Sequence, residues 1–457
     1  MAIPEDTTTQ TPDPESADAA EDAAGDTAGD TAVAGPAAPR RRGGGLWRNR
    51  DFLVFWTGET LSLYGTQVTT LALPLAAVLV FDASAEELGV LRFLQLVPFL
   101  GLAMLFGVWV DRVRKRPVMI GANAARMVLI GLVPALSAAD VLNLSLLYAV
   151  AFGIGVAQVL FDVSWMSYVP VLVKDRRHLV EANTKLSTTS SSADVAGPGV
   201  AGVLVNALTA PTAMAVNAVT YLLSIASLLA IRTPEPRPAK PERRRSIRAD
   251  LVEGLRFVFG SRLLRAIALV GCACNFFSVM ILSLFLLYAV RGQHLSAATI
   301  GLVMGVGAVG GLAGSAVSGT VIRRVSVGRA YLVSVSGIFV APLLIPAAGG
   351  SKLMVTGVFI ASFLVFYASL SVANVVIVSL RQTITPDPLM ARMTAAMRTL
   401  MHGGGALGGP VGGLLAGALG LHEALWLAAA LSAVMLVPIA LSPVSRLHEM
   451  PAPTPVP

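Results

Sequence analysis

Five charged side chains fall inside long apolar stretches of the sequence, where charge is rare. They are Glu59, Arg92, Arg126, Asp162 and Asp194. A charged side chain at the centre of a membrane-spanning helix costs about 2.5–3.5 kcal/mol on insertion scales, so each such residue needs a partner or a function. A carboxylate in surroundings poor in water can also bind and release a proton near neutral pH. These five residues are therefore the first candidates for chemistry.

The three carboxylates have two possible roles, which the sequence leaves open. Asp162 and Asp194 both lie in the part of their apolar stretch that is nearer to a basic linker. Each can carry a coupled proton, or each can pair with Arg126 or with linker cations and hold helices together. For Glu59, near the start of its stretch, a structural pair with linker cations is favoured over a proton site. Arg92 and Arg126 are the candidate charge partners inside the apolar stretches.

Amide and aromatic side chains in the middle of apolar stretches are candidates to line a substrate cavity. Such side chains can orient a small molecule, although aromatic residues in membrane helices more often pack or face lipid. The apolar character of the set favours amphiphilic or hydrophobic substrates over sugars and phosphorylated solutes. The candidates are Gln67, Gln95, Asn123, Asn217, Tyr221, Asn275, Phe276 and Asn374, with Phe277 and Phe366 as further aromatic residues.

Composition places these residues in a membrane protein with many spans. Hydrophobic residues make up 55% of the chain and charged residues 13%, and the mean hydropathy is +0.72. The net charge of +7 sits in short linkers and has no interleaved aromatic platform, which argues against nucleic-acid binding. Cys272 and Cys274 share one apolar stretch, so neither a disulfide framework nor a zinc site is expected. No phosphate loop, metal-ligand cluster or nucleophile triad indicates an enzyme, an ATP-driven pump or a cofactor.

The apolar stretches predict an all-α membrane protein with twelve transmembrane helices, since about 20 apolar residues cross a bilayer. Five linkers that alternate along the chain carry most of the Lys and Arg and are therefore expected inside, together with both termini. The other linkers hold little beyond Asp82, Asp140, Arg291, Lys352 and Glu423. The predicted helices are 53–81, 86–110, 117–138, 142–170, 187–208, 212–231, 264–290, 296–321, 329–347, 353–379, 397–419 and 423–442.

A basic, Pro-rich connector divides the predicted helices into two sets of six. We expect a disordered cytoplasmic tail at 1–44, an N-terminal six-helix half at 45–231, a connector at 232–263, a C-terminal half at 264–443 and a Pro-rich tail at 444–457. An amphipathic helix from Ile247 to Phe259 is expected in the connector. The halves echo one another, since Gly197-Pro198 in the fifth helix matches Gly409-Pro410 in the eleventh. Both prolines are hinge candidates.

A short basic loop joins the second and third predicted helices. Its sequence from Gly107 to Arg116 reads G-x-x-x-D-R-x-x-K-R. This pattern in this position resembles the signature loop of the major facilitator superfamily of secondary transporters. Further stretches resemble the branch of that family with bacterial macrolide and enterobactin exporters: Leu46-Trp47-Arg48-Asn49-Arg50-Asp51-Phe52, Leu73-Pro74-Leu75, Phe161-Asp162, Tyr168-Val169-Pro170, Glu181-Ala182-Asn183, Asn217-Ala218 and Ser379-Leu380-Arg381-Gln382.

The resemblance implies a gating role for the basic loop. Gly107 would let helices approach closely, and Asp111 would sit at the cytoplasmic helix ends and stabilise one conformation. The corresponding stretch of the second half has Arg323 where Asp111 would be, so the two gates are expected to differ. The predicted gating residues are Gly107, Asp111, Arg112, Lys115, Arg116, Arg323 and Arg324.

The function implied is secondary active transport by alternating access, with a substrate site between the halves. The leading hypothesis is a monomeric, proton-coupled exporter of small amphiphilic molecules such as drugs, secondary metabolites or siderophores, in the cell membrane. A lipid or lysolipid flippase is the alternative within transport. From another class, the same fold could serve as a membrane sensor that does not transport.

Overall fold

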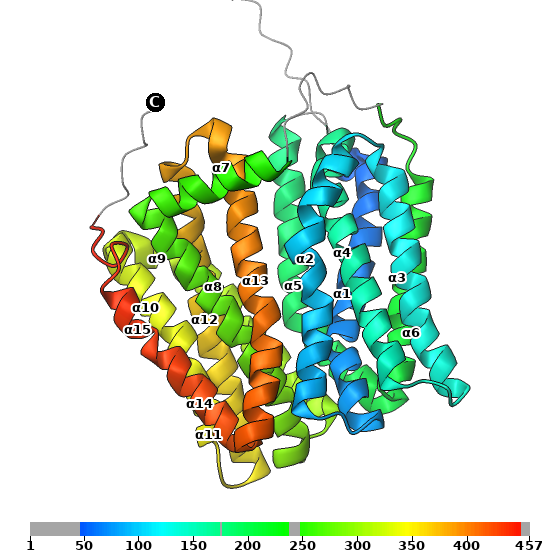
Figure 1. Cartoon of the computed structure of the whole chain (residues 1–457). Coiled ribbons are helices and arrows are strands. Elements are labelled where there is room, and N and C mark those ends of the chain that lie inside the picture. Colours follow the sequence, from blue (N-terminus) through cyan, green and yellow to red (C-terminus); the bar gives the residue numbers. More distant parts are fainter. Residues whose placement is uncertain (1–45, 174–175, 237–246, 449–457) are drawn as a thin grey trace, which may run out of the picture. The chain divides into compact units, whose positions relative to one another are not determined.

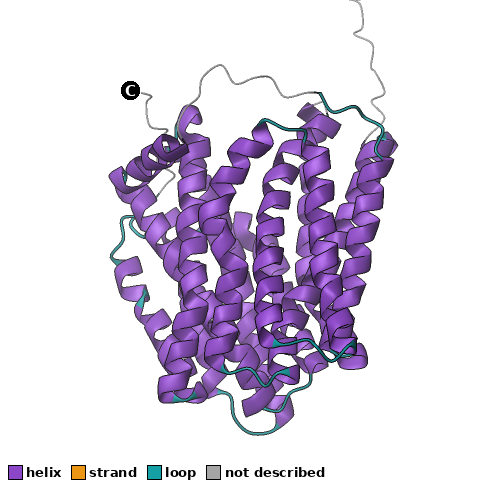
Figure 2. Cartoon of the chain, turned by 45° about the vertical axis from the view of Figure 1, so that its right-hand side comes forward, coloured by secondary structure: helices purple, strands orange, loops and turns teal. Residues whose placement is uncertain are grey.

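The computed structural model describes residues 46–173, 176–236 and 247–448, and all regular structure in these ranges is helical (Figures 1 and 2). The predicted tail 1–44, part of the connector and the chain after residue 448 lie outside them. The longer helices are α1 Arg50–Val80, α2 Ala85–Asp111, α3 Lys115–Ala138, α4 Leu144–Leu172, α5 Arg176–Leu208, α6 Ala210–Ala230, α7 Ile247–Gly260, α8 Arg262–Leu287, α9 Ala297–Arg324, α10 Val327–Val340, α12 Lys352–Ile384, α13 Asp387–Leu419 and α14 Leu421–Val434. Short helices complete the chain: η1 Leu46–Arg48, the π-helical turn η2 Tyr288–Gly292, η3 Ala341–Leu343, α11 Leu344–Ala347 and α15 Leu436–Ala440.

Polar residues at the helix starts fix where many of these helices begin. Asn49 accepts a hydrogen bond from the Phe52 amide at 3.1 Å and caps α1. Ser84 and Glu87 form a capping box at the start of α2. A serine caps each of four later helices in the same way, because its hydroxyl satisfies an amide that the first turn leaves free. These serines are Ser261, Ser296, Ser326 and Ser351.

The all-α membrane fold is as predicted. Among the described residues, nine helical segments are long and apolar enough to cross a membrane. The helices α2, α5 and α13, of 27, 33 and 33 residues, pack among them. The count of twelve spans therefore remains a prediction, of which nine meet the criteria of length and composition.

Three of the predicted helices are too short. The fifth helix begins at residue 176 instead of 187, the tenth ends at 384 instead of 379, and the eleventh begins at 387 instead of 397. In each case a polar stretch continues the helix beyond its apolar part. Helical geometry needs only backbone hydrogen bonds, whereas hydropathy detects the apolar part alone.

The helix contacts repeat between α1–α6, here called the first bundle, and α8–α15, the second bundle. In the first bundle α1 packs on α5 and α6, α2 on α4, and α3 on α4 and α6. In the second bundle α8 packs on α13 and α14, α9 on α12, and α10 on α12 and α14. The repeat thus pairs α1 with α8, α3 with α10, α4 with α12 and α6 with α14. The helix α7, which matches the amphipathic helix expected from the sequence, packs on α13 and crosses the end of the second bundle (Figure 1).

The apolar core is shared at one end of the bundles and separate at the other. We call the end with residues 112–114 the basic end, and the end with Asp82 the opposite end. Near the opposite end, one cluster combines residues of both bundles, such as Leu75 of α1 and Leu284 of α8. Near the basic end, a cluster around Phe55 and Met119 belongs to the first bundle, and another around Ile267 and Leu380 belongs to the second. The bundles are therefore joined by apolar packing at the opposite end.

Candidate functional site

Glycines bring the two bundles into backbone contact near the opposite end. A Cβ atom at Gly89 of α2 would lie 2.5 Å from the carbonyl oxygen of Gly409 of α13. A Cβ atom at Gly202 of α5 would lie 2.8 Å from the Cα of Gly301 of α9. No side chain fits at either position without moving a backbone, so these helix pairs touch as closely as helices can.

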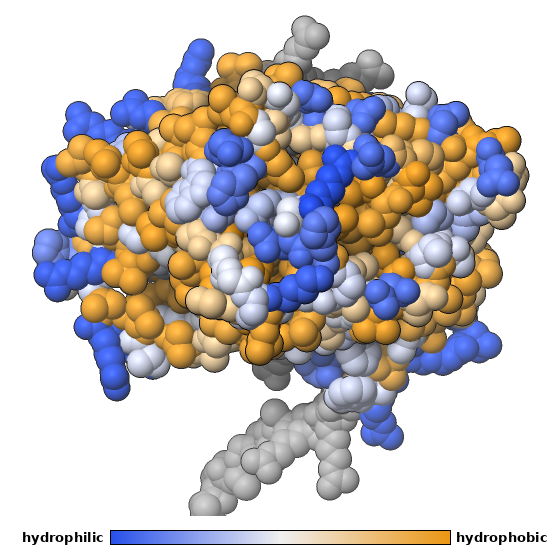
Figure 3. All heavy atoms as spheres, turned by 90° about the horizontal axis from the view of Figure 1, so that it is seen from below, coloured by the Kyte–Doolittle hydropathy of each residue, from blue (hydrophilic) through white to orange (hydrophobic). Residues whose placement is uncertain are grey.

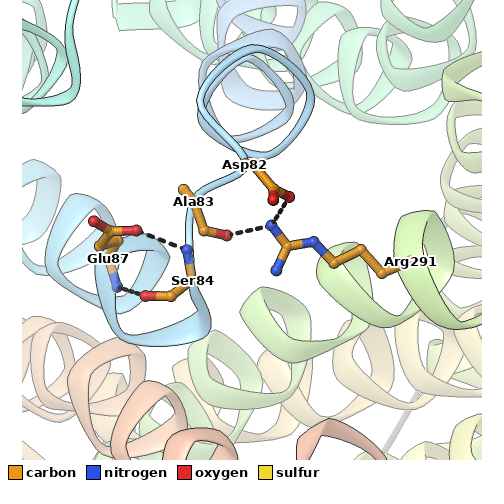
Figure 4. Close-up of polar contacts among 5 residues, drawn as sticks. All are labelled: Asp82, Ala83, Ser84, Glu87 and Arg291. Carbon is orange, nitrogen blue, oxygen red and sulfur yellow. Dashed lines mark hydrogen bonds and ion pairs between the residues drawn. The ribbon is translucent and has the colours of Figure 1, made fainter.

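An ion pair also connects the bundles at this end (Figure 4). Arg291, in the π-helical turn after α8, donates to the Asp82 carboxylate and, at 3.0 Å, to the carbonyl oxygen of Ala83. Asp82 lies in the loop between α1 and α2, next to the Ser84–Glu87 capping box. Figure 3 shows the molecule from this end, where hydrophilic and hydrophobic residues are interspersed. The pair is exposed and so contributes at most about 1 kcal/mol to the contact.

At the basic end α5 and α9 separate and leave a cavity of about 690 Å³. Its α5 wall is polar and includes Asn183, Thr184, Ser187, Thr188, Ser191 and Ser192, and α9 contributes Leu312 and Ser315. At Gly107 a Cβ atom would meet nothing within 4 Å in this conformation, so the close helix contact expected there stays a prediction. The space between the bundles is thus closed at the opposite end and open at the basic end.

A buried arginine occupies the middle of the first bundle. Arg126 of α3 is 1% exposed, and its guanidinium carbon lies 4.1 Å from the centre of the Phe161 ring and 4.7 Å from that of Tyr221. Its terminal nitrogens donate to Gln158 Oε1 at 2.7 Å and to the side-chain oxygen of Asn123. Two ring faces and two amide oxygens therefore surround the cation, and these contacts offset part of its desolvation cost.

Two carboxylates adjoin this arginine. Gln158 donates to Asp162 Oδ1 at 2.8 Å, so one amide side chain joins Arg126 to Asp162. Glu59 of α1 is 7% exposed and lies within Coulomb range of both Arg126 and Asp162. The charged neighbours of Glu59 are therefore Arg126 and Asp162, in place of the linker cations that the sequence favoured.

Asp162 also faces charges of the second bundle. Arg398 and His402, both on α13, lie within Coulomb range of its carboxylate. His402 stacks on Phe99 of α2 at 4.7 Å between ring centres, and Arg398 reaches Met166 Sδ of α4 at 3.6 Å. Asp162 is thus placed where charged groups of both bundles meet.

Asp194 occupies a different environment. Its carboxylate is exposed and accepts a hydrogen bond from Gln67 Nε2 at 2.7 Å. Tyr367 of α12, in the second bundle, lies within Coulomb range of it. Asp194 therefore borders the space between the bundles and does not pair with Arg126.

Several predicted cavity residues are buried in helix packing instead. Asn123 and Asn217 are 0% exposed and Tyr221 is 1% exposed. Asn217 donates to Thr69 Oγ1 at 2.6 Å, and Asn123 to Ser224 Oγ at 2.9 Å. For these three residues the cavity assignment is wrong in this conformation, because their polar atoms are used to join helices of the first bundle.

The remaining candidates lie in several different environments. Gln95 accepts a hydrogen bond from half-buried Arg92 at 3.3 Å, and Arg92 Cβ approaches Gly409. Phe276 packs by its backbone against Gly408, Asn275 borders a cavity in the second bundle, and Asn374 is exposed. The hinge candidates Pro198 and Pro410 lie inside continuous helices, α5 and α13, next to the glycine contacts.

Hydrogen bonds join the basic loop to the beginning of the connector, just after α6. The Glu235 carboxylate accepts hydrogen bonds from the backbone amides of Lys115 and Arg116, the latter at 3.0 Å, and so caps the start of α3. The Arg116 guanidinium donates to the carbonyl oxygen of Leu229. Arg112, Arg323 and Arg324 are exposed, and the side chain of Asp111 lies outside the described part of the chain. The gating roles remain predictions.

Comparison with known proteins identifies the family. The sequence pattern of the Major Facilitator Superfamily matches residues 55–408. The chain belongs to the Major Facilitator Superfamily. It is therefore a membrane transporter and not an enzyme, as the sequence predicts.

Relatives agree with the predicted drug-exporter branch. The Multidrug efflux pump Tap of Mycolicibacterium fortuitum is 26% identical over 396 residues, which cover 84% of this chain and 93% of that pump. The solved structure of the nucleoside transporter NupG has the same fold, with a TM-score of 0.69 and 12% identity over 86% of this chain and 98% of that one. A bacterial homologue of the iron transporter ferroportin, solved in an inward-facing state, gives a TM-score of 0.65 at 17% identity, again over 86% and 98%.

Three residues that make central contacts are not predicted from the sequence. Gln158 joins Arg126 to Asp162, Glu235 caps α3, and Arg291 binds Asp82. A signal existed for Gln158, since it lies four residues before Asp162 and thus on the same helix face. Glu235 and Arg291 act across more than a hundred residues, and no local pattern marks them.

The glycine contact generates a first prediction. We expect Gly89→Ala to weaken closure of the opposite end, because the added methyl group meets the Gly409 backbone. The matched control is Gly101→Ala in the same helix, where a Cβ atom meets nothing within 4 Å and alanine gains about 1 kcal/mol of helix propensity. In a background without Cys272 and Cys274, accessibility of a cysteine introduced at buried Ala297, which lies beside Gly202 at the start of α9, to a membrane-impermeant reagent reports closure. Equal labelling of both variants would contradict the glycine contact.

The Arg126 cluster generates a second prediction. We expect Arg126→Met to lower the free energy of unfolding by about 1–3 kcal/mol, because it leaves the side-chain oxygens of Gln158 and Asn123 without their donor inside the bundle. Arg126→Lys keeps the charge but loses the planar stacking and the paired donors, so its loss should be intermediate. Thermal unfolding of the purified proteins in one detergent measures both. A Met variant as stable as the native protein would show that the cluster is not a structural element.

Proposed function

We propose that this chain is a proton-coupled exporter of small amphiphilic molecules, working as a monomer in the cell membrane with its basic end in the cytoplasm. Membership of the Major Facilitator Superfamily and likeness to a multidrug efflux pump support export of such molecules. The closure at one end and the opening at the other support alternating access by rocking of the two bundles. In this orientation the described conformation is open to the cytoplasm, where an exporter takes up its substrate.

The placement of Asp162 carries the proposal of proton coupling. It is joined to Arg126 through Gln158 and faces Arg398 and His402 from the other bundle. Rocking of the bundles changes the distance to Arg398 and His402 but leaves Arg126 in place. The charge on Asp162 therefore contributes to the contact between the bundles, and protonation weakens that contribution. This links proton binding to the conformational step.

Neutralising Asp162 separates this proposal from a purely structural role. Arg126 is held by two rings and two amide oxygens, and no described contact joins it directly to the Asp162 carboxylate. We therefore expect Asp162→Asn to fold with little loss of stability and to bind and exchange substrate, since exchange moves no net proton. It should lose accumulation driven by a proton gradient, and its transport should become insensitive to pH.

Asp194→Asn is the matched variant, since Asp194 is also an intramembrane carboxylate but accepts its described hydrogen bond from Gln67. Inverted vesicles with an imposed proton gradient and a panel of amphiphilic substrates provide the measurement. If Asp162→Asn still concentrates substrate and Asp194→Asn does not, the proton site is Asp194. If both variants still concentrate substrate, neither aspartate is the proton site. Glu59, or a driving ion other than the proton, then takes its place in the proposal. Movement of lysolipids alone would favour the flippase.

The proposed orientation has its own test. In a variant with Cys272 and Cys274 replaced by serine, single cysteines are introduced at exposed positions 140 and 236, at opposite ends of the bundle. We expect a membrane-impermeant maleimide to label position 140 in intact cells, and position 236 only after permeabilisation. Labelling of position 236 from outside would reverse the orientation and the direction of transport.

A further inference from the structure

The second bundle contains a cavity where the first bundle contains the Arg126 cluster. The cavity has a volume of about 240 Å³ and lies among α8, α10, α12 and α14 with the break between α10 and α11. The Arg126 cluster draws its side chains from α1, α3, α4 and α6, which the repeat of contacts pairs with those same helices. One bundle therefore has a stacked cation at this place, and the other has open space.

The cavity walls have the chemistry of a site for flat rings. Aromatic side chains from three helices line it, namely Phe277, Phe339, Phe363, Phe366 and Tyr367. No Asp, Glu, Lys, Arg or His is among the described residues that line it. An engineered apolar cavity of about 150 Å³ binds benzene, so 240 Å³ has room for two fused rings.

Three polar groups at the cavity are free to orient a ligand. Asn275 donates to the Gly271 carbonyl oxygen, and its own side-chain oxygen accepts no hydrogen bond from described residues. The Ser278 hydroxyl has only a 4.0 Å contact with Cys274 Sγ, and the Tyr367 hydroxyl has no described hydrogen-bond partner. By contrast, Ser362 and Ser432 are used by the helix break, since they donate to the carbonyl oxygens of Ala341 and Phe339 at 2.8 and 3.2 Å.

The cavity borders the space between the bundles on two sides. On one side Asn275 and Val279 lie beside Gly405 of α13, with Leu96 of α2 also within 4 Å of a Cβ atom placed there. On the other side Tyr367 lies beside Gly311 of α9 and within Coulomb range of Asp194. A molecule between the bundles can therefore reach the cavity with one end.

We propose that this cavity is a binding pocket for a planar aromatic group of about two fused rings, with Asn275, Ser278 and Tyr367 as its polar contacts. The ring system takes the place that the Arg126 guanidinium has in the first bundle, between aromatic faces. As the pocket for the aromatic part of the exported molecule, it rests on the proposed export function. Binding can nevertheless be measured without transport.

The test is binding of 2-naphthol to the full-length protein in lipid nanodiscs, measured by calorimetry against empty nanodiscs. Decahydro-2-naphthol, with the same carbon skeleton and hydroxyl but no aromatic face, is the matched ligand. We expect 2-naphthol to bind more tightly. Ser278→Leu fills part of the cavity and should weaken binding about tenfold or more, because the added side chain occupies space that the ring system needs. Ala361→Leu, at an exposed position of α12, adds the same bulk outside the pocket and should bind normally.

Phe366→Leu provides a second variant that removes one ring face and keeps the apolar surface, so it should reduce the preference for the aromatic ligand even if Ser278→Leu fails to fold. Equal binding of the two ligands to the native protein, or native binding in a folded Ser278→Leu variant, would overturn the pocket. Absence of 2-naphthol binding would also overturn it. If the pocket variants behave as expected but vesicles transport none of the substrate panel, export fails and the pocket stands.

Discussion

The charge of Arg126, buried in an apolar bundle, is the constraint on which the first bundle depends. A guanidinium without water must find compensation from its neighbours, and here rings and amides from α3, α4 and α6 provide it. Because these neutral groups hold the cation, the Asp162 carboxylate is not needed as its direct partner. Asp162 is connected to the cluster through Gln158 and remains able to respond to the second bundle. The charge of Arg126, which its neighbours hold in place, thus lies close to the charge of Asp162, which can respond to the second bundle.

The two bundles repeat their backbone arrangement but not their interior chemistry. At equivalent places, one is filled by a cation with its partners and the other is an aromatic cavity without charged walls. With the two proposals above, this difference would divide the tasks of a coupled transporter between the bundles. Proton binding is proposed for the first, where low dielectric strengthens charge interactions. Ring binding is proposed for the second, where no charge has to be desolvated when a ring enters.

The sequence predicts the fold and the unusual charges because both depend on local composition. Long apolar stretches identify the helices, and Arg126, Asp162 and Asp194 stand out against them. It does not predict that Asn217 is buried, that Glu235 caps α3 or that a Cβ atom at Gly107 would meet no described atom within 4 Å, since these depend on how distant helices rotate and pack. The cavity in the second bundle is a volume left between side chains of four helices, and no residue pattern encodes such a volume. The start of α5, residues 176–186, lies outside the predicted helix because its charged and amide side chains give it a low hydropathy.

The proposed alternating access requires that the opposite end closes and opens again, and the contacts at this end suit both steps. Gly89 meets Gly409 and Gly202 meets Gly301 by backbone atoms, so no side chains interlock and none must change rotamer when the helices part. The polar addition is the exposed pair of Arg291 and Asp82, worth at most about 1 kcal/mol. Contact between smooth helix faces is lost as soon as the backbones separate, because dispersion attraction falls steeply with distance. A contact of this kind is either made or lost, with little stability between, and this suits the alternating access that we propose.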